Sequence, residues 1–246
     1  ILGMTAGFTV LTAQKFGAGD MKAMRKTVGN AAILAIIMSL IMTVLGMMAM
    51  KPLLGIMKTP DDIFKDAYAY IMVICGGIAA QMLYNFLSSV LRALGNSKVP
   101  LYFLILAALL NIVLDMVFII AFHMGAAGAA WATVLGQIAS LALAAVFHFR
   151  LNRELPFRRK ALRLRRSIVG EIYSIGVPAI IAQGAMSVMN YCVNLIFGSL
   201  DSSYVTAYGI VYKIQQFVLF AAFGLRDAIT PIVSFSYGMQ YAKRTL

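Results

Sequence analysis

The stretch PLYFLILAALLNIVLDMVFIIAF, residues 100 to 122, decides the fold class, because almost every side chain in it is apolar. About 20 consecutive apolar residues are enough for a helix to cross the hydrocarbon core of a bilayer. Similar runs recur along all 246 residues, of which 61% are hydrophobic and only 12% charged, with a mean hydropathy of +0.86. Soluble domains are about 45–50% apolar and about 25% charged. The sequence therefore predicts an all-α integral membrane protein, a polytopic helical bundle.

Seven apolar runs are expected to form the helices of this bundle. The first, residues 1–16, is short and lacks an initiator Met, so we expect the sequence to begin inside a helix of a longer protein. The others are expected at residues 29–50, 67–91, 100–122, 125–149, 168–200 and 204–237. Long unbroken runs of this kind satisfy their backbone hydrogen bonds as helices rather than as the short alternating strands of a barrel.

The loops between these runs alternate in charge. Lys and Arg gather in four loops, at residues 17–26, 92–98, 150–167 and 241–246. The loops between them in sequence, at residues 51–65, 123–125 and 199–203, are not basic. Of these three, only residues 51–65 contain Lys, and acidic residues in the same loop balance that charge. Basic loops stay on the cytoplasmic side of a membrane. We therefore expect the four basic loops in the cytoplasm, with the protein in the plasma membrane of a bacterium or archaeon. The net charge of +12 then reflects topology and contact with anionic membrane lipid, and no nucleic-acid partner is expected.

A weak internal repeat joins the two ends of the chain. LGMTAGFTVLTAQKFGAGDMK, residues 2–22, aligns at one fixed offset with FGLRDAITPIVSFSYGMQYAK, residues 223–243, which pairs Gly3 with Gly224 and Gly17 with Gly238. Each stretch ends an apolar run with an aromatic residue and Gly and then enters a basic loop, so the two runs face the same way. This pattern predicts a parallel, pseudo-twofold repeat of two lobes, residues 1–149 and 168–246, joined by a basic cytoplasmic linker at residues 150–167.

Several motifs resemble those of the multidrug and toxic compound extrusion (MATE) family. They are AQKFGAGD (13–20), LRALGNSKVP (91–100), NIVLD (111–115), GAAGAAWATVLGQ (125–137) and GVPAIIAQ (176–183). The resemblance covers nearly the whole chain and implies the family's two-lobed architecture, of which the chain would hold helices two to eight and lack helix one and helices nine to twelve. It implies a secondary active exporter that works by alternating access and cation antiport, not an enzyme, with no cofactor beyond a coupling proton or sodium ion.

Asn111 and Asp115 are the polar exceptions within residues 100–122. Four positions apart, they lie on one face of a helix, one turn from each other. An ionised aspartate at the bilayer centre costs about 2.5 kcal/mol or more, so this face is expected to point into the bundle or a wet cavity. The pair favours a proton or cation site, because burial disfavours a charged carboxylate and lets it exchange a proton. A hydrogen bond between two helices is the alternative.

The resemblance adds partners to this pair. In one MATE branch, a helix-five Asn and Asp act with an Asn on helix four, a Thr on helix six and an Asp on helix one. The matching positions here are Asn85 and Thr133, whereas the helix-one Asp has no counterpart in the chain. Tyr70 matches a tyrosine that lines the same cavity in relatives, although an interfacial anchor is an equal reading. No metal site is expected, other than sodium at Asp115 if sodium is the coupling ion.

A second polar stripe lies in the run 168–200. Its members recur at helical spacing, which places them on one face: Gln183, Ser187, Asn190 and Asn194. They are expected to line the substrate pathway or, alternatively, to hold helices together. Other MATE branches carry a glutamate for sodium coupling on this helix, and that position is Met186 here. This departure argues against a carboxylate coupling site on this helix.

Three charges fall in the last run, at Lys213, Arg226 and Asp227, and match no motif that can be carried over. Arg226 and Asp227 are expected to pair with other helices, which is the favoured reading, or to contact substrate in one conformation, whereas Lys213 is expected to extend outward to the membrane surface. For the protein as a whole, the expected substrates are amphipathic, cationic small molecules, and the expected state is a monomer. A flippase of the same superfamily for lipid-linked precursors is the alternative function, although few basic residues support it. An intramembrane enzyme or a membrane scaffold is less favoured, because the two His are badly placed for catalysis.

Overall fold

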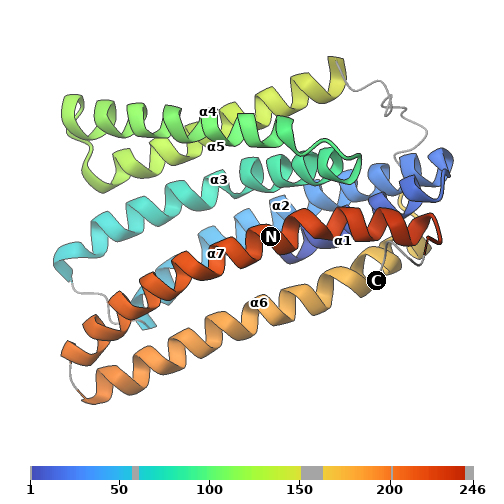
Figure 1. Cartoon of the computed structure of the whole chain (residues 1–246). Helices are drawn as coiled ribbons and strands as arrows, with labels where there is room; N and C mark the ends of the chain where they lie inside the picture. The colour runs from blue at the N-terminus through green and yellow to red at the C-terminus, as the bar shows by residue number, and fades with distance from the viewer. Residues whose placement is uncertain (1, 57–60, 151–162, 201, 242–246) are drawn as a thin grey trace. The chain divides into compact units, whose positions relative to one another are not determined.

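The computed structural model describes residues 2–56, 61–150, 163–200 and 202–241, and every regular element in them is a helix (Figure 1). In chain order they are α1 (Leu2–Gly17), α2 (Met21–Ile56), α3 (Asp61–Ala93), α4 (Lys98–Met116), the π-helical turn η1 (Val117–Ala121), α5 (Gly125–Arg150), α6 (Arg166–Leu200) and α7 (Ser202–Gly238). Six spans among them are long and apolar enough to cross a membrane, with η1 continuing α4 in one of them. The predicted all-α membrane fold is confirmed.

Contacts divide the chain into two compact units. One contains residues 1–24, 93–95 and 167–246, and therefore α1, α6 and α7; the other contains residues 25–92 and 96–166, and therefore most of α2 and α3 with α4, η1 and α5. The contacts of α1 thus group it with α6 and α7. The predicted lobes at residues 1–149 and 168–246 stay a prediction, and most of the predicted linker, residues 151–162, lies outside the described residues.

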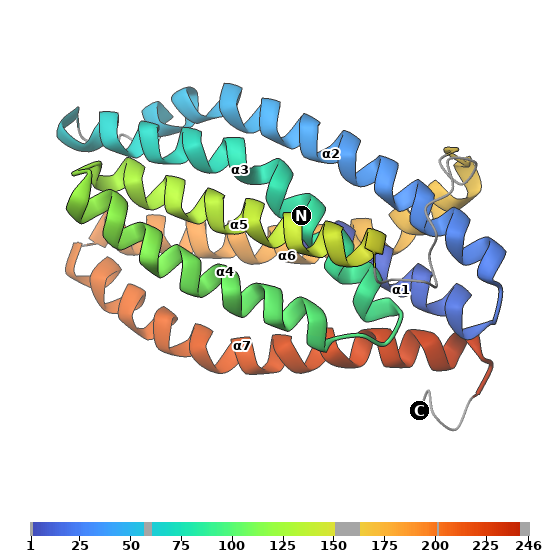
Figure 2. The same cartoon turned by 90° about the horizontal axis from the view of Figure 1, so that it is seen from above.

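In the second unit, α4 and α5 form a hairpin and lie side by side in both views (Figures 1 and 2). The turn between them is minimal, and His123 and Gly125 adopt positive φ angles of 51° and 56° to reverse the chain. The amide of Met124 donates to the carbonyl of Phe118 at 3.0 Å, which closes the end of η1. This tight turn keeps the facing side chains of α4 and α5 in a fixed register.

In the first unit, small residues let α1 approach α6 closely. Gly3 and Gly7 are one turn apart on α1, and a Cβ atom at either would lie 2.7 Å from backbone atoms of α6, at Ile180 and Ile172 respectively. Gly176 of α6 belongs to the same contact, because a Cβ atom added to it would lie 3.5 Å from the carbonyl oxygen of Gly3. Small residues at such spacing allow backbones to approach within a membrane, where packing rather than water drives association.

The ends of α1 and α7 form a reciprocal contact that confirms the internal repeat. A Cβ atom on Gly17 would collide with the carbonyl of Phe235, and a Cβ atom on Gly238 would collide with the carbonyl of Gln14. At the predicted offset, Gly17 corresponds to Gly238 and Gln14 corresponds to Phe235. When residue i contacts j and the counterpart of i contacts the counterpart of j, the two segments are related by a local twofold axis.

The turns that follow the two helices repeat the same bonds. The amide of Ala18 donates to the carbonyl of Gln14 at 3.0 Å, and the equivalent amide of Met239 donates to the carbonyl of Phe235 at 3.1 Å. The next residues, Gly19 and Gln240, both adopt positive φ, at 71° and 56°. Weak identity between the two stretches therefore conceals a close equivalence of backbone structure.

Candidate functional site

The predicted site residues on α4 and α5 meet through one hydrogen bond. Nδ2 of Asn111 donates to Oγ1 of Thr133 at 3.4 Å, and Oγ1 of Thr133 in turn donates to the carbonyl of Ala129, one turn back on α5, at 3.0 Å. Both side chains are half-buried. The structure thus brings Asn111 and Thr133 together, 22 positions apart in the chain.

Small residues on α5 allow this approach. Gly136 lies one turn beyond Thr133, and a Cβ atom there would lie 3.2 Å from the carbonyl oxygen of Ala107 and 3.7 Å from Cβ of Asn111. One further turn along, Oγ of Ser140 donates to the carbonyl of Phe103 at 3.2 Å. The face formed by Thr133, Gly136 and Ser140 therefore sets the distance between α4 and α5.

Asp115 lies one turn beyond Asn111 and is half-buried. Its Oδ1 atom is inaccessible to solvent and has no hydrogen-bond partner among the described residues. Buried polar atoms almost always have a partner, so an unpaired carboxylate oxygen marks a place where another group can bind. The π-helical turn η1 begins two residues later, and such turns occur frequently at functional sites.

The other two predicted residues of this site, on α3, make no hydrogen bond to Asn111, Asp115 or Thr133 within the described part of the chain. α3 contacts α5 at Gly77, where a Cβ atom would lie 2.6 Å from Cγ2 of Val134. Asn85 is half-buried and lies eight residues from Gly77, which corresponds to about 12 Å along the helix. Tyr70 lies on the other side of Gly77 and is 38% exposed. Their roles stay predictions.

The polar stripe on α6 lies in the unit that contains α1 and α7. Asn190 is half-buried, and its Oδ1 atom accepts a hydrogen bond from the hydroxyl of Tyr208 on α7 at 3.1 Å. Asn194 donates to the carbonyl of Asn190 at 2.8 Å, and Ser187 donates to the carbonyl of Gln183 at 3.3 Å. Gln183, Ser187 and Asn194 are exposed, as is Met186 at 46%. One end of this face is therefore joined to α7.

The aromatic ring of Tyr208 extends this contact. Its centroid lies 5.4 Å from that of Phe197 on α6 and 5.7 Å from that of Tyr212, one turn along α7. The hydroxyl of Tyr212 accepts a hydrogen bond from Gln216, one turn further. Amide and aromatic side chains are thus in contact with one another where α6 meets α7.

The charged residues of α7 pair locally. Arg226 and Asp227 form an ion pair with a nitrogen–oxygen distance of 3.0 Å, and both side chains are exposed. Lys213 is also exposed, and no bond is recorded for it within the described part of the chain. Within the described residues, Arg226 and Asp227 therefore pair with each other on α7, and the pairing with other helices that the sequence suggested is not found.

The α4–α5 site offers oxygen atoms for a proton or a hard cation. Carboxylate, amide and hydroxyl oxygens come from Asp115, Asn111 and Thr133, and oxygen ligands suit hard cations such as sodium. Among the described residues, no three His, Cys, Asp or Glu side chains cluster as a transition-metal site would require.

Sequence reasoning missed three residues that shape these sites. Gly136 and Ser140 follow Thr133 at intervals of three and four, so helical spacing alone could have placed them on its face. Tyr208 begins a series, continued by Tyr212 and Gln216, whose four-residue spacing is visible in the sequence. Its partner Asn190 was predicted, but no sequence pattern pairs one helix face with another.

Comparison with known proteins matches the family model MatE over residues 1–117 and 178–245. A Bacillus subtilis protein named Probable multidrug resistance protein YpnP is 31% identical over 251 residues, covering 99% of this chain and 54% of that protein. Multidrug export protein MepA of Staphylococcus haemolyticus is 25% identical over 156 residues, covering 63% of this chain and 34% of that protein. The chain thus spans about half the length, or less, of these curated relatives.

A solved structure of a MOP superfamily transporter from Pyrococcus furiosus superposes with a TM-score of 0.93 at 22% sequence identity. The superposition covers 99% of this chain and 54% of that one. At this identity the likeness concerns the fold.

Proposed function

This chain belongs to the MatE family, the MATE transporters whose motifs it resembles, and we propose that the whole protein is a secondary active exporter of multiple drugs or toxins. In this proposal, a cation moves inward through the site at Asp115 while an amphipathic compound leaves the cell. The family membership rests on the match of the MatE model to residues 1–117 and 178–245. The multi-pass membrane fold, with six membrane-spanning helices among the described residues, supports a transport function.

One observation carries the coupling proposal: Oδ1 of Asp115 is buried and has no hydrogen-bond partner in the described chain. In an apolar span, an unpaired carboxylate oxygen is costly, and binding of a proton or a sodium ion removes that cost. Asn111 lies one turn away, with its amide nitrogen engaged by Thr133, which leaves the amide oxygen free to face an incoming cation. Proton and sodium are both compatible with this set of oxygens.

A cation at Asp115 would act on the equilibrium between outward-open and inward-open states. A ligand shifts such an equilibrium only by its difference in affinity for the two states. We propose that the α4–α5 contact differs between the states, so that the cation-bound site favours one and the empty site favours the other. A difference of about 1.4 kcal/mol would change the ratio of states tenfold.

The substrate is proposed to be an amphipathic, cationic small molecule. The relatives' names refer to multidrug resistance and multidrug export, and say nothing about the charge of the compounds. The support lies in the contact of α6 with α7, where Tyr208 donates to Asn190 and packs on Phe197, and in the exposed, flexible thioether of Met186 on α6. Aromatic rings attract cations, and methionine adapts to varied apolar shapes.

The proposal is tested with the full-length protein in proteoliposomes. A proton gradient or a sodium gradient is imposed, and export of a fluorescent cationic dye is measured for the natural protein and for Asp115→Asn. Asparagine keeps the size of the side chain but cannot carry the charge. We expect gradient-driven export to fall to background in the variant, while dye binding in the absence of a gradient is retained.

Asp20→Asn is the matched control for this experiment. Asp20 caps the start of α2, where its carboxylate accepts a hydrogen bond from the amide of Ala23 at 2.9 Å, and asparagine caps helices equally well. The same chemical change at this position should leave export intact. Full gradient-driven export by Asp115→Asn would refute the coupling role of this carboxylate.

A further inference from the structure

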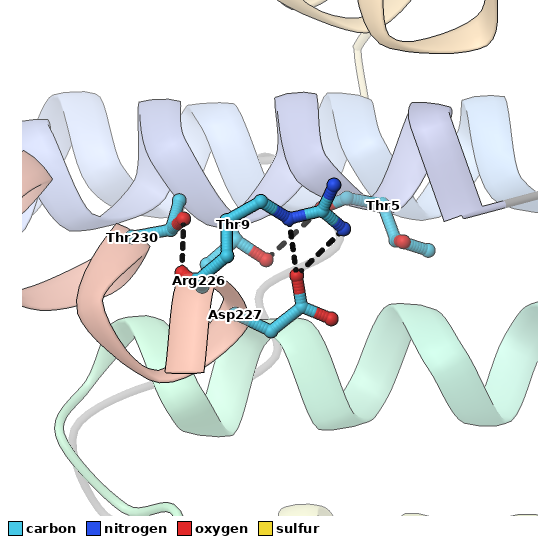
Figure 3. Close-up of polar contacts among 5 residues, drawn as sticks. All are labelled: Thr5, Thr9, Arg226, Asp227 and Thr230. Carbon is cyan, nitrogen blue, oxygen red and sulfur yellow. Dashed lines mark hydrogen bonds and ion pairs between the residues drawn. The ribbon is translucent and has the colours of Figure 1, made fainter. Parts of the chain in front are cut away.

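The two repeats differ sharply at one place, in the middle of α7. Arg226 and Asp227 correspond to Thr5 and Ala6 of α1. The surrounding structure is equivalent: Oγ1 of Thr9 donates to the carbonyl of Thr5 at 2.9 Å, and Oγ1 of its counterpart Thr230 donates to the carbonyl of Arg226 at 2.7 Å (Figure 3). The same backbone thus carries a neutral pair in one repeat and a charged pair in the other. The fold of the repeat therefore does not require the charges.

The location of the pair makes it costly. Arg226 lies 12 residues before the end of α7 at Gly238, which corresponds to about 18 Å along a helix within a membrane span. A charged side chain at such a depth costs about 2.5–3.5 kcal/mol by insertion scales unless it faces a bundle interior or a wet cavity. Intramembrane charges at this cost are, by default, candidates for function.

The geometry of the ion pair leaves one guanidinium nitrogen and one carboxylate oxygen without a hydrogen bond in the described chain. Both Nε and Nη2 of Arg226 donate to the same atom, Oδ1 of Asp227, at 3.1 and 3.0 Å. Nη1 of the guanidinium and Oδ2 of the carboxylate take no part in a hydrogen bond within the described chain (Figure 3). The two side chains are 63% and 51% exposed. A donor and an acceptor of opposite charge are therefore presented side by side.

Two features hold the guanidinium in place. Besides its bonds to Asp227, its central carbon lies 5.1 Å from the ring centroid of Phe223, one turn back on α7. Such a cation–π contact restricts a side chain that would otherwise be flexible. An arginine held by both contacts presents its remaining N–H groups in a restricted direction, which suits a carboxylate.

The pair also shares a helix face with the aromatic and amide residues described above. Tyr208 and Arg226 are 18 residues apart, which is five full helical turns, so they lie on the same side of α7. Tyr212 and Gln216 lie on this side as well, each one turn further along. One face of α7 therefore carries rings, an amide and a charge pair in series.

We propose that Arg226 and Asp227 form a subsite for zwitterionic amphipathic compounds, in which Arg226 binds the acidic group and Asp227 binds the cationic group. This inference rests on the proposed export function and assigns to these two residues of α7 the binding of a compound that carries both a cation and a carboxylate. The ligand's two charges replace water around the free Nη1 and Oδ2 atoms. Phe223, whose ring lies against the guanidinium, contacts the apolar body of the compound.

The test measures binding of two matched dyes to the full-length protein in detergent, by fluorescence anisotropy. Rhodamine B carries a cationic ring system and a free carboxylate, whereas its ethyl ester keeps the ring system and lacks the acid. We expect Arg226→Gln to weaken binding of rhodamine B roughly tenfold to a hundredfold, the usual effect of losing a hydrogen bond to a charged group. Binding of the ester should change by less than about twofold, since the ester makes no such bond.

Asp227→Asn should act in the opposite sense on the ratio of the two affinities. Both dyes then lose the partner of their cationic group, so the ester should bind more weakly, and rhodamine B should lose less affinity because the guanidinium is no longer shared with an internal carboxylate. Arg226→Gln/Asp227→Asn removes both charges and should bind the two dyes with similar affinity. Lys213→Gln removes one positive charge from α7 outside the pair and should leave the ratio unchanged.

A pair with only a structural role would give another result. If Arg226→Gln and Asp227→Asn change the affinities for both dyes by the same factor, or change neither, the subsite is refuted. The neutral double variant guards against misfolding of the single ones, because it leaves no unpaired charge in the membrane. Binding in detergent needs no gradient, so a failure of cation-coupled export in proteoliposomes would refute the proposed function and leave this result unaffected.

Discussion

Gly17 and Gly238 occupy equivalent positions at the ends of α1 and α7, and each packs against the backbone of the other helix. Gly17 faces the carbonyl of Phe235, and Gly238 faces the carbonyl of Gln14. Since both contacts involve backbone atoms, neither partner can move aside by changing a rotamer. The crossing of α1 and α7 is therefore fixed by two glycines whose contributions should be equal by symmetry.

Replacing either glycine by valine should destabilise this crossing to a similar extent. Gly17→Val and Gly238→Val each place a branched side chain where a backbone carbonyl lies, and overpacking of this kind costs about 1–3 kcal/mol. The thermal unfolding midpoint of the full-length protein in detergent measures the effect. Gly170→Val on α6 serves as control, because no atom of the described chain lies within 4 Å of an added Cβ there. If only one of the two valine variants had a much lower unfolding midpoint than the natural protein, the local twofold relation would be contradicted.

The bond between Asn111 and Thr133 predicts a modest effect of removing the hydroxyl. Thr133→Val keeps the shape of the side chain and loses the acceptor, and hydrogen bonds between membrane helices average about 0.6 kcal/mol. We expect a small loss of thermal stability and a weaker dependence of export on the gradient. Thr133→Ser retains the hydroxyl and should behave like the natural protein. Equal behaviour of the valine and serine variants would show that this bond plays no part in coupling.

The close approach at Gly136 predicts a larger effect. Gly136→Val would force α4 away from α5, because the carbonyl oxygen of Ala107 already lies 3.2 Å from the position of an added Cβ. The cost is about 1–3 kcal/mol, and the altered position of Asn111 should lower gradient-driven export. Gly76→Val on α3 provides the comparison, because only the flexible end of Met47 lies near it. Normal export by Gly136→Val would mean that the α4–α5 spacing does not matter for the site.

The helices could be predicted from the sequence because the solvent restricts the choice so strongly. In a bilayer, an apolar run such as residues 100–122 can satisfy all its backbone hydrogen bonds within the segment only as a helix. The structure places α4 and η1 over nearly the same residues. The repeat could also be predicted, since the aromatic-Gly ending and basic loop recur at both ends. The π-helical turn after Asp115 could not, because its hydrogen-bond pattern follows from how the helix end meets the turn to α5.

The candidate site was only partly predictable, and the reason is physical. Residues of one helix, such as Asn111 and Asp115, follow from periodicity alone. The contact with Thr133 required the resemblance to MATE transporters, because spacing says nothing about which faces of two helices meet. Asn85 shows the limit of this reasoning: its residue type and motif suggest the site, but it makes no recorded hydrogen bond to the site residues, and the close approach of α3 to α5 at Gly77 lies about two turns away.

The link between Asn190 and Tyr208 leads to a prediction about substrate binding. Tyr208→Phe removes the hydroxyl that donates to Asn190 and keeps the ring that packs on Phe197. Asn190 then has a free amide oxygen, while the apolar surface of this part of α6 and α7 is unchanged. We therefore expect protein stability to fall by only about 0.6 kcal/mol, and we expect a different pattern of dye affinities.

Dyes that carry a hydrogen-bond donor should bind to Tyr208→Phe at least as tightly as to the natural protein, because the amide oxygen of Asn190 is now available to them. Dyes without a donor should bind as before, since the rings of Phe197 and residue 208 remain. Fluorescence anisotropy with full-length protein in detergent measures both affinities. Tyr191→Phe is the matched control, because Tyr191 is 59% exposed on α6 and no bond of its hydroxyl is recorded in the described chain. If Tyr208→Phe alters neither affinity nor stability, the Asn190–Tyr208 bond contributes nothing to the pathway, and the face of α6 must bind its substrates without it.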